Sequence, residues 1–278
     1  MSNETNLLMT LQLLISTYND GIARIPEMLL PAEEGISYLV TWQQSQDYSP
    51  CTLPHKLLRA DVEVYPIKGL GLSRNRNNCL NHATGGICMI ADDDCIYTRE
   101  GLKEVIETFE ANPDLDLATF QLKNTDEPKV YPDFSFDLKG ARCVKDYFIT
   151  SVEIAFKRDS VKGRIAFDEN FGLSSGVFHA GEDSIFIQDA IDAGLNCRFF
   201  PVEVLEQRGF TTATTRLNDE KVIMAQGAYL YRCYRSTMYL RSMLISWRMH
   251  KQQGVPFPFA LKSFLKGIGK MRELSATK

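Results

Sequence analysis

The segment Ile87-Cys88-Met89-Ile90-Ala91-Asp92-Asp93-Asp94 decides the expected fold of this chain. Its first five residues form an uninterrupted apolar run, which is typical of a central parallel strand that is covered on both faces. Three carboxylates follow at the end of this predicted strand. Because open α/β sheets bind their ligands at the carboxyl ends of strands, the segment predicts a central strand with a functional site beside it.

Strands and helices alternate on both sides of this segment. We expect strands at residues 11–16, 36–42, 60–67 and 115–122, and helices at 22–30, from 73 to before Gly85-Gly86, and from the N-cap Thr98 to Asn112. This pattern predicts an α/β fold with a mostly parallel sheet flanked by helices. Beyond it we expect an antiparallel strand at 151–156, a long functional loop at 163–181, a helix at 182–193 and a strand at 197–202.

Composition and charge bound the class of protein. The chain has 278 residues, of which 44% are hydrophobic and 24% are charged, which excludes a disordered chain. Its net charge of -4 is too balanced for a protein whose whole surface binds nucleic acid, so we expect no nucleic-acid partner. Residues 221–278 carry about +10 and the preceding residues about -14. This asymmetry predicts an acidic body at 1–220 and a basic helical tail at 221–278.

Cysteine usage and hydropathy point to the cytoplasm. The seven cysteines include no Cys-x-x-Cys pair, so we expect reduced thiols rather than a disulfide framework or a zinc site. The polar start of the chain does not resemble a secretory signal. Arginines interrupt the apolar stretches near the C-terminus, so no segment is expected to cross a bilayer.

The aspartate triplet is the strongest candidate site. In a strand-like conformation Asp92 and Asp94 point the same way, and together they can bind one Mg²⁺ or Mn²⁺ while a diphosphate supplies the remaining ligands. The alternative interpretation is a solvated acidic turn that caps the next helix.

Two further segments carry charged groups at predicted helix starts. Glu182-Asp183 follows Gly181, where the positive end of a helix favours an ionised carboxylate that can serve as a base. Ordinary first-turn acids are the alternative. Arg74 and Arg76 oppose the dipole of their own helix, which indicates an anionic partner nearby unless they are surface charges.

The chain resembles family 2 glycosyltransferases of the GT-A fold over roughly residues 8–205. The resemblance rests on the order and spacing of four segments, namely Ser16-Thr17-Tyr18-Asn19, Gly71-x-Ser73-x-x-Arg76-Asn77, Asp92-x-Asp94 and Gly181-Glu182-Asp183. The chain departs from the family where an Asp-rich segment would follow the second strand, because Thr41-Trp42-Gln43-Gln44-Ser45 stands there. It also lacks the Gln-x-x-Arg-Trp signature of processive members, so the resemblance points to transfer of a single sugar.

The resemblance assigns roles to residues of this chain. It implies that Asp183 is the catalytic base with Glu182 as its acidic neighbour. It also implies that Asp94 binds the metal and that Asp92 faces the nucleotide ribose or the metal. Tyr18 would stack on the nucleotide base, Gln43 or Gln44 would bond a base edge, and Arg208 either closes over the diphosphate or belongs to a surface loop. The full set of expected nucleotide-sugar contacts is Thr17, Tyr18, Asn19, Gln43, Arg76, Asp92, Asp93 and Arg208.

The implied activity is that of an inverting, metal-dependent hexosyltransferase. It would use Mn²⁺ or Mg²⁺ and a nucleotide-diphosphate sugar, with UDP as the expected nucleotide, and its acceptor would be a glycan or lipid-linked saccharide of a bacterial surface polysaccharide. Two rivals stay open: a phosphotransferase with Asp92 as nucleophile, although Cys95-Ile96 replaces the residues expected after such a motif, and a non-catalytic glycan-binding protein.

The tail interleaves basic residues with aromatic and apolar ones, namely Tyr229, Tyr231, Tyr234, Tyr239, Met243, Trp247 and residues 257–264. This pattern favours peripheral contact with the inner face of the cytoplasmic membrane through its anionic lipids. A helical extension packed on the body is the alternative.

Overall fold

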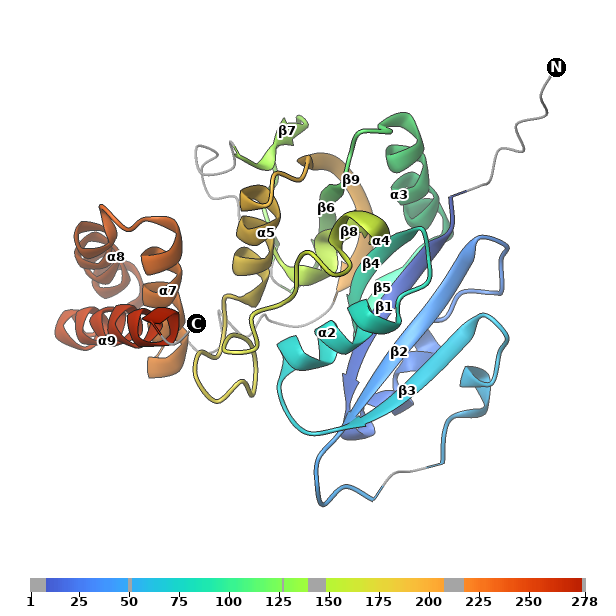
Figure 1. Cartoon of the computed structure of the whole chain (residues 1–278), viewed down its shortest axis with the longest axis horizontal. Helices are drawn as coiled ribbons and strands as arrows, with labels where there is room; N and C mark the ends of the chain where they lie inside the picture. Colours follow the sequence, from blue (N-terminus) through green and yellow to red (C-terminus); the bar gives the residue numbers. More distant parts are fainter. Residues whose placement is uncertain (1–8, 50–51, 127, 140–148, 208–217, 277–278) are drawn as a thin grey trace. The chain divides into compact units, whose positions relative to one another are not determined.

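The structure, a computed structural model, describes residues 9–49, 52–126, 128–139, 149–207 and 218–276 (Figure 1). Two units are distinguished by their internal contacts. The first contains the described residues of Met1–Leu70, Arg74–Ala166 and Asp189–Gly209. The second contains those of Gly71–Ser73, Phe167–Gln188 and Phe210–Lys278. The domain boundary expected after residue 220 stays a prediction.

A mixed, mostly parallel sheet forms the centre of the first unit. Its described strands are β1 (Leu11–Tyr18), β2 (Ile36–Gln44), β3 (Val62–Lys68), β4 (Ile87–Asp92), β5 (Cys95–Tyr97), β6 (Leu117–Asn124), β7 (Phe136–Asp137), β8 (Ile154–Lys157) and β9 (Cys197–Gln207). They follow the order β3-β2-β1-β4-β8-β6-β9-β5, and β7 pairs with β9. The first four strands of this order run parallel, and β8 is antiparallel to both β4 and β6. The predicted α/β fold is confirmed.

The apolar segment forms β4, as predicted. Ile87 to Ala91 are all buried, and the strand lies between β1 and β8. In the β1–β4 register Ser16 lies opposite Asp92, so the end of β4 meets the end of β1. The site expected beside the strand therefore lies at an edge built by several strand ends.

Helices flank the sheet, and most of them match their sequence signals. In α3 (Arg99–Ala111) the Thr98 side chain accepts a hydrogen bond from Gly101 N at 3.0 Å, and Leu102, Val105 and Phe109 are buried. The helix predicted at 22–30 is wrong in extent. It is replaced by a 3₁₀ turn, η1 (Asn19–Ala23), and the single turn α1 (Ile25–Met28). Leu30 precedes Pro31, a position that disfavours helical backbone.

Shorter elements complete the first unit, namely η2 (His55–Leu57), α2 (Leu72–His82), η4 (Ser151–Glu153) and α4 (Arg158–Val161). The described cysteines Cys79, Cys88, Cys95, Cys197 and Cys233 are free thiols, as expected. Among the described helices none is both long and apolar enough to cross a membrane.

The second unit is mainly helical. Its helices are the start of α5 (Glu182–Asp192), α7 (Glu220–Cys233), α8 (Met238–Gln253) and α9 (Phe257–Ala276). Residues 167–181 form the predicted loop, in which Phe171 and Phe178 make an isolated bridge. These two rings pack with Ile185 against residues of α7 and α9, so the loop shares a core with the C-terminal helices.

Two glycines allow α7 and α9 to approach closely. A Cβ at Gly267 would lie 2.0 Å from the Met224 carbonyl oxygen, and one at Gly227 would lie 2.3 Å from that of Phe264.

Replacing Gly267 with Ala should therefore separate the helices and lower the free energy of unfolding by about 1–3 kcal/mol. Gly269 is the matched control, because a Cβ added there would meet nothing within 4 Å. There Ala should raise stability by up to about 1 kcal/mol through helix propensity. Thermal unfolding of both variants measures the difference, and equal midpoints would contradict the close approach.

Candidate active site

The carboxyl ends of β1, β2 and β4 bring candidate residues to one edge of the sheet. Thr17 lies opposite Trp42, and Tyr18 lies opposite Gln43, in the β1–β2 register. Gln43 is 3% exposed, whereas Tyr18 is 44% exposed. A buried amide and an accessible ring thus lie at adjacent strand ends.

A fixed turn follows Tyr18. Asn19 adopts a positive φ of 45°, a conformation that Asn tolerates better than most residues. Its carbonyl oxygen accepts a hydrogen bond from Trp42 Nε1 at 2.7 Å, and its Oδ1 accepts one from Ser45 N at 2.9 Å. These bonds tie the turn after β1 to the end of β2, so the Tyr18 ring projects from a well-defined backbone.

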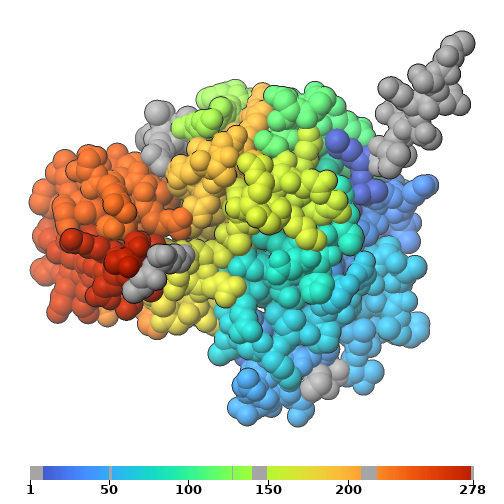
Figure 2. Space-filling model, viewed as in Figure 1, coloured from blue at the N-terminus to red at the C-terminus, as the bar shows by residue number. Residues whose placement is uncertain are grey.

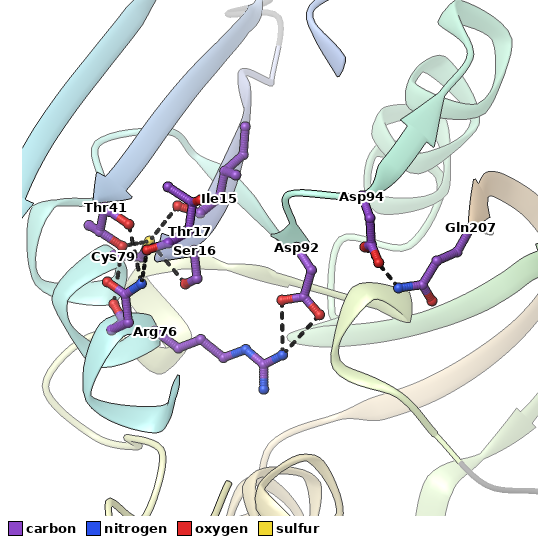
Figure 3. Close-up of polar contacts among 10 residues, drawn as sticks. Ile15, Ser16, Thr17, Thr41, Arg76, Cys79, Asp92, Asp94 and Gln207 are labelled. Atoms are coloured by element: carbon purple, nitrogen blue, oxygen red, sulfur yellow. Dashed lines mark hydrogen bonds and ion pairs between the residues drawn. The ribbon is translucent and has the colours of Figure 1, made fainter. Parts of the chain in front are cut away.

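A buried polar network holds α2 against β1 and β2 (Figure 3). Asn75 Nδ2 donates to the carbonyl oxygens of Thr17 and Thr41 at 3.0 and 3.2 Å. The Cys79 thiol lies 2.9 Å from Thr41 Oγ1, and burial raises its pKa to about 11. Asn75 was not among the predicted site residues, although it lies inside the Ser73 to Asn77 motif. The network positions the next residue, Arg76.

Arg76 points from α2 to the end of β4. Its side chain is 3% exposed, and its Nη2 lies 3.0 and 3.3 Å from the two oxygens of Asp92, whose side chain is 30% exposed. Arg76 is therefore not a surface charge, and Asp92 is the anion that it faces. Arg74, two residues earlier, is exposed.

This pair can be tested by a double-mutant cycle. Replacing Arg76 with Met and Asp92 with Asn, separately and together, should give a coupling energy of about 1 kcal/mol in denaturant unfolding, because Asp92 is partly solvated. Arg74→Met is the matched control and should leave stability within roughly 0.5 kcal/mol of the parent. Additive effects of the two site substitutions would show that the ion pair does not form.

Asp93 and Asp94 lie in the turn after β4 rather than in the strand. The strand ends at Asp92, so the strand-like alternation expected to align Asp92 with Asp94 does not extend through the triplet. Asp93 accepts hydrogen bonds from Thr17 Oγ1 and Arg24 Nη2, both at 2.5 Å, and Asp94 accepts one from Gln207 Nε2 at 3.0 Å. In Figure 3 the Asp92 and Asp94 side chains extend to different partners. Arg24 and Gln207 were not among the site residues predicted from the sequence, because their contacts with the triplet are long-range and leave no local sequence signal.

The carboxylates of this turn are crowded. Burial raises the pKa of Asp94, the bond from Gln207 opposes this effect, and the charges of Asp92 and Asp93 raise it further. Burial also raises the pKa of Asp93, although Thr17 and Arg24 counteract it. A cation would relieve this crowding, and carboxylate oxygens suit Mg²⁺ or Mn²⁺.

No cluster of three or more metal-binding side chains occurs in the described part of the chain. A cation at this turn would have Asp92 and Asp94 as its candidate protein ligands, and a diphosphate or water would have to supply the others.

Glu182 and Asp183 open α5 in the second unit. Gly181 before them has a φ of +90°, and Glu182 is 8% exposed while Asp183 is half-buried. Gly172 has a φ of +99°, and a Cβ there would lie 2.9 Å from Ser73 Oγ and 3.3 Å from Glu182 Cδ. Ser73 Oγ in turn donates to the Phe171 carbonyl at 2.6 Å. The glycine loop therefore packs directly against the Glu182 side chain.

The sequence leaves open whether His179 contacts a ligand or belongs to an ordinary loop. In the structure it pairs with another side chain of the protein. Its Nδ1 lies 3.3 Å from Asp219 Oδ2. Asp219 caps α7 by accepting a bond from Lys221 N at 2.8 Å. Burial raises the pKa of Asp219, but the bonds from Lys221 and His179 outweigh burial and lower it. Arg208 and the threonine run after it lie outside the described residues.

Comparisons with known proteins agree with this architecture. The model of the family described as "Glycosyl transferase family 2" matches residues 41–175, just under half of the chain. This segment includes Arg76 and the aspartate triplet, but neither Tyr18 nor Asp183. A comparison with curated proteins finds no match.

Solved structures share the fold at low sequence identity. TarS of S. aureus superposes with a TM-score of 0.56 at 13% identity, covering 88% of this chain, and the chain spans 44% of that protein's length. TarS residues 1–349 in complex with UDP-GlcNAc gives a TM-score of 0.55 at 14% identity, with 97% of this chain and 92% of that chain covered. A mycobacterial protein gives 0.52 at 15% identity, with 79% and 74% covered.

The sheet and its flanking helices thus have the GT-A, Rossmann-like architecture. Within this architecture, the segment at residues 41–175 is similar to family 2 glycosyltransferases.

Proposed function

We propose that this protein is an inverting family 2 glycosyltransferase that moves a single sugar from a nucleotide-diphosphate sugar to a hydroxyl group of an acceptor saccharide. The observation that carries the proposal is the Asp92 to Asp94 turn at the end of the central strand, with Arg76 buried beneath Asp92, in the segment that matches the family model. The structural similarity to a protein in complex with UDP-GlcNAc supports a UDP-sugar as donor.

The donor is proposed to bind at the ends of β1, β2 and β4. The exposed Tyr18 ring would stack on the base, and the Asn19 turn and Gln43 would line the same pocket. Asp92, oriented by Arg76, would face the ribose or a bound cation, and Asp94 would hold that cation beside the diphosphate. When bound, Mn²⁺ or Mg²⁺ offsets the negative charge that develops on the leaving diphosphate.

Asp183 is proposed as the general base. The acceptor hydroxyl oxygen forms a bond to the anomeric carbon as the bond from that carbon to the diphosphate breaks, and the hydroxyl proton passes to the Asp183 carboxylate. Attack on the side opposite to the leaving group inverts the anomeric configuration. The start of α5 favours the ionised form that this role needs. Glu182 packs against Gly172 and would hold the glycine loop in place beside the acceptor.

The acceptor is proposed to be a glycan or lipid-linked saccharide of a bacterial surface polysaccharide. The basic C-terminal helices support this choice, because they would bring the enzyme to the inner face of an anionic membrane, where lipid-linked acceptors are available. The missing processive signature supports transfer of one sugar at a time.

The direct test is thermal unfolding of the full-length protein with a panel of nucleotide sugars, with and without Mn²⁺. At about 100 times its dissociation constant, the true donor should add roughly 2.7 kcal/mol to the free energy of unfolding. We expect a UDP-sugar to raise the melting temperature only when Mn²⁺ or Mg²⁺ is present. The absence of a shift with every nucleotide sugar would refute the proposal.

A further inference from the structure

The outer face of α8 carries large apolar side chains, whereas its buried residues are two serines and Met249. The exposed fractions are 57% for Tyr239, 55% for Leu240, 46% for Met243, 54% for Leu244 and 58% for Trp247. Their spacing of three and four residues places them along one stripe of the helix. In contrast, Ser242 and Ser246 are fully buried on the other side. We refer to the five exposed residues as the α8 stripe.

A surface helix usually turns its large apolar side chains toward the core. Helix α8 buries Met249 in this way, but it leaves the five apolar side chains of the α8 stripe exposed. The described chain exposes thirteen large hydrophobic residues, and five of them lie in this one helix of 16 residues. A concentrated apolar patch on a protein surface marks a contact with another molecule. The α8 stripe is therefore expected to have a partner.

A second apolar surface lies on α9. It is an open groove of about 520 Å³ lined by Phe257, Pro258, Leu261, Lys262, Leu265 and Lys266. Lys266 pairs with Glu220, whereas no described acidic residue pairs with Lys262. The groove thus combines an apolar lining with cationic groups, which is the pattern that an anionic lipid complements. Figure 2 shows α7, α8 and α9 as one continuous body, coloured orange to red.

Charge decides between a membrane and a second copy of the chain. Helices α8 and α9 contain a single acidic residue, Glu273, against seven cations, namely Arg241, Arg248, Lys251, Lys262, Lys266, Lys270 and Arg272. Two copies meeting through this surface would bring like charges together, which opposes association. An anionic bilayer instead attracts each cation, while Tyr and Trp suit the membrane–water interface.

We propose that the α8 stripe and the α9 groove together form the surface that docks on an anionic lipid bilayer. The proposal rests on the membrane location included in the proposed function, but not on sugar transfer. It also corrects the sequence-based set of membrane-facing aromatic residues. Tyr231 and Phe264 are buried in the helical core, and Tyr229 and Tyr234 are half-buried, so these rings support the helices instead.

The two tryptophans of the chain provide a local probe. Trp42 is 5% exposed in the core of the first unit, whereas Trp247 lies in the α8 stripe. Addition of vesicles of phosphatidylcholine mixed with phosphatidylglycerol should shift the tryptophan emission of the full-length protein to the blue. Trp247→Phe should abolish the shift, and phosphatidylcholine alone should produce little. A shift that persists in Trp247→Phe, or equal shifts with both vesicles, would overturn the proposal.

Charge and apolar variants test the two components of the surface. The triple substitution Arg248→Glu, Lys251→Glu, Lys262→Glu should weaken binding to the anionic vesicles by about 100-fold or more, since each surface cation adds about fivefold to the affinity. Leu244→Ser should also weaken binding. The matched controls are Lys56→Glu and Leu58→Ser, two exposed positions of the first unit, which should leave binding unchanged. Unchanged binding of the triple variant would refute the electrostatic component and the proposal with it.

Two further measurements distinguish membrane docking from self-association and from donor binding. Sedimentation velocity without vesicles should show a monomer, whereas a dimer that Leu244→Glu dissociates would assign the α8 stripe to contacts between copies and overturn the proposal. The vesicle experiments contain no nucleotide. Loss of vesicle binding with an intact Mn²⁺-dependent shift by UDP would therefore refute membrane docking alone, whereas the reverse result would refute the donor site alone.

Discussion

Replacing Asp183 with Asn should lower the rate of sugar transfer by roughly 10²–10⁴, the range typical of losing a general base. Asn keeps the size of the side chain but cannot accept the proton of the acceptor hydroxyl. The affinity for the donor should barely change, because the residues proposed to hold it lie at the ends of β1, β2 and β4. The informative measurement is the transfer rate and the donor dissociation constant on one Asp183→Asn preparation.

The control for the Asp183 substitution lies on the same helix. Asp192→Asn changes an exposed carboxylate at the other end of α5 and should leave transfer unaffected. Near-normal transfer by Asp183→Asn would assign the base to another residue, and Glu182 would be the next candidate. Loss of donor binding in the same variant would instead make Asp183 a donor ligand.

Replacing Asp94 with Ala should abolish the Mn²⁺-dependent binding of a nucleoside diphosphate while the fold stays intact. Among the described residues, Asp94 accepts a side-chain bond from Gln207 Nε2 and lies at a turn outside the strand ladder, so its removal leaves the sheet undisturbed. Without it, only Asp92 would remain of the two proposed metal ligands. Calorimetry with UDP, with and without Mn²⁺, measures the loss, and Asp47→Ala, an exposed position after β2, is the control. Unchanged Mn²⁺-dependent binding by the Asp94→Ala variant would contradict the assignment of Asp94 as a metal ligand.

The same site predicts a direction for the effect of pH. Burial, together with the charges of Asp92 and Asp93, raises the pKa of Asp94 above its ordinary value, and a cation binds only the ionised carboxylate. Mn²⁺-dependent binding should therefore strengthen as the pH rises, and its loss on acidification should begin above the value of about 4 that is usual for aspartate. Binding that stays constant down to that pH would contradict the predicted coupling.

The elements with strong local signals were predictable without the structure. The continuous apolar run of β4 can only be buried on both faces, and Thr98 ends up as the cap of α3 because its hydroxyl satisfies a free backbone N–H of the first turn. The positions of the main strands along the chain, and that of the aspartate triplet after the central strand, follow from the same short-range pattern. In contrast, the helix expected at 22–30 is replaced by a 3₁₀ turn and a single helical turn, and Pro31 disfavours helical backbone at the residue before it.

The sequence by itself determined an α/β sheet, the strand end that bears the carboxylates, and a cationic helical tail. Only the tertiary structure decided which partners those groups have. Arg76 faces Asp92 across 16 residues and Gln207 bonds Asp94 across 113, and no local pattern encodes contacts that depend on how distant strands pair. Likewise, the aromatic residues of the tail look alike in sequence, yet Tyr231 and Phe264 are buried while Trp247 is exposed. Periodicity shows that a helix has two faces, but the burial of each face depends on the helices that pack against it.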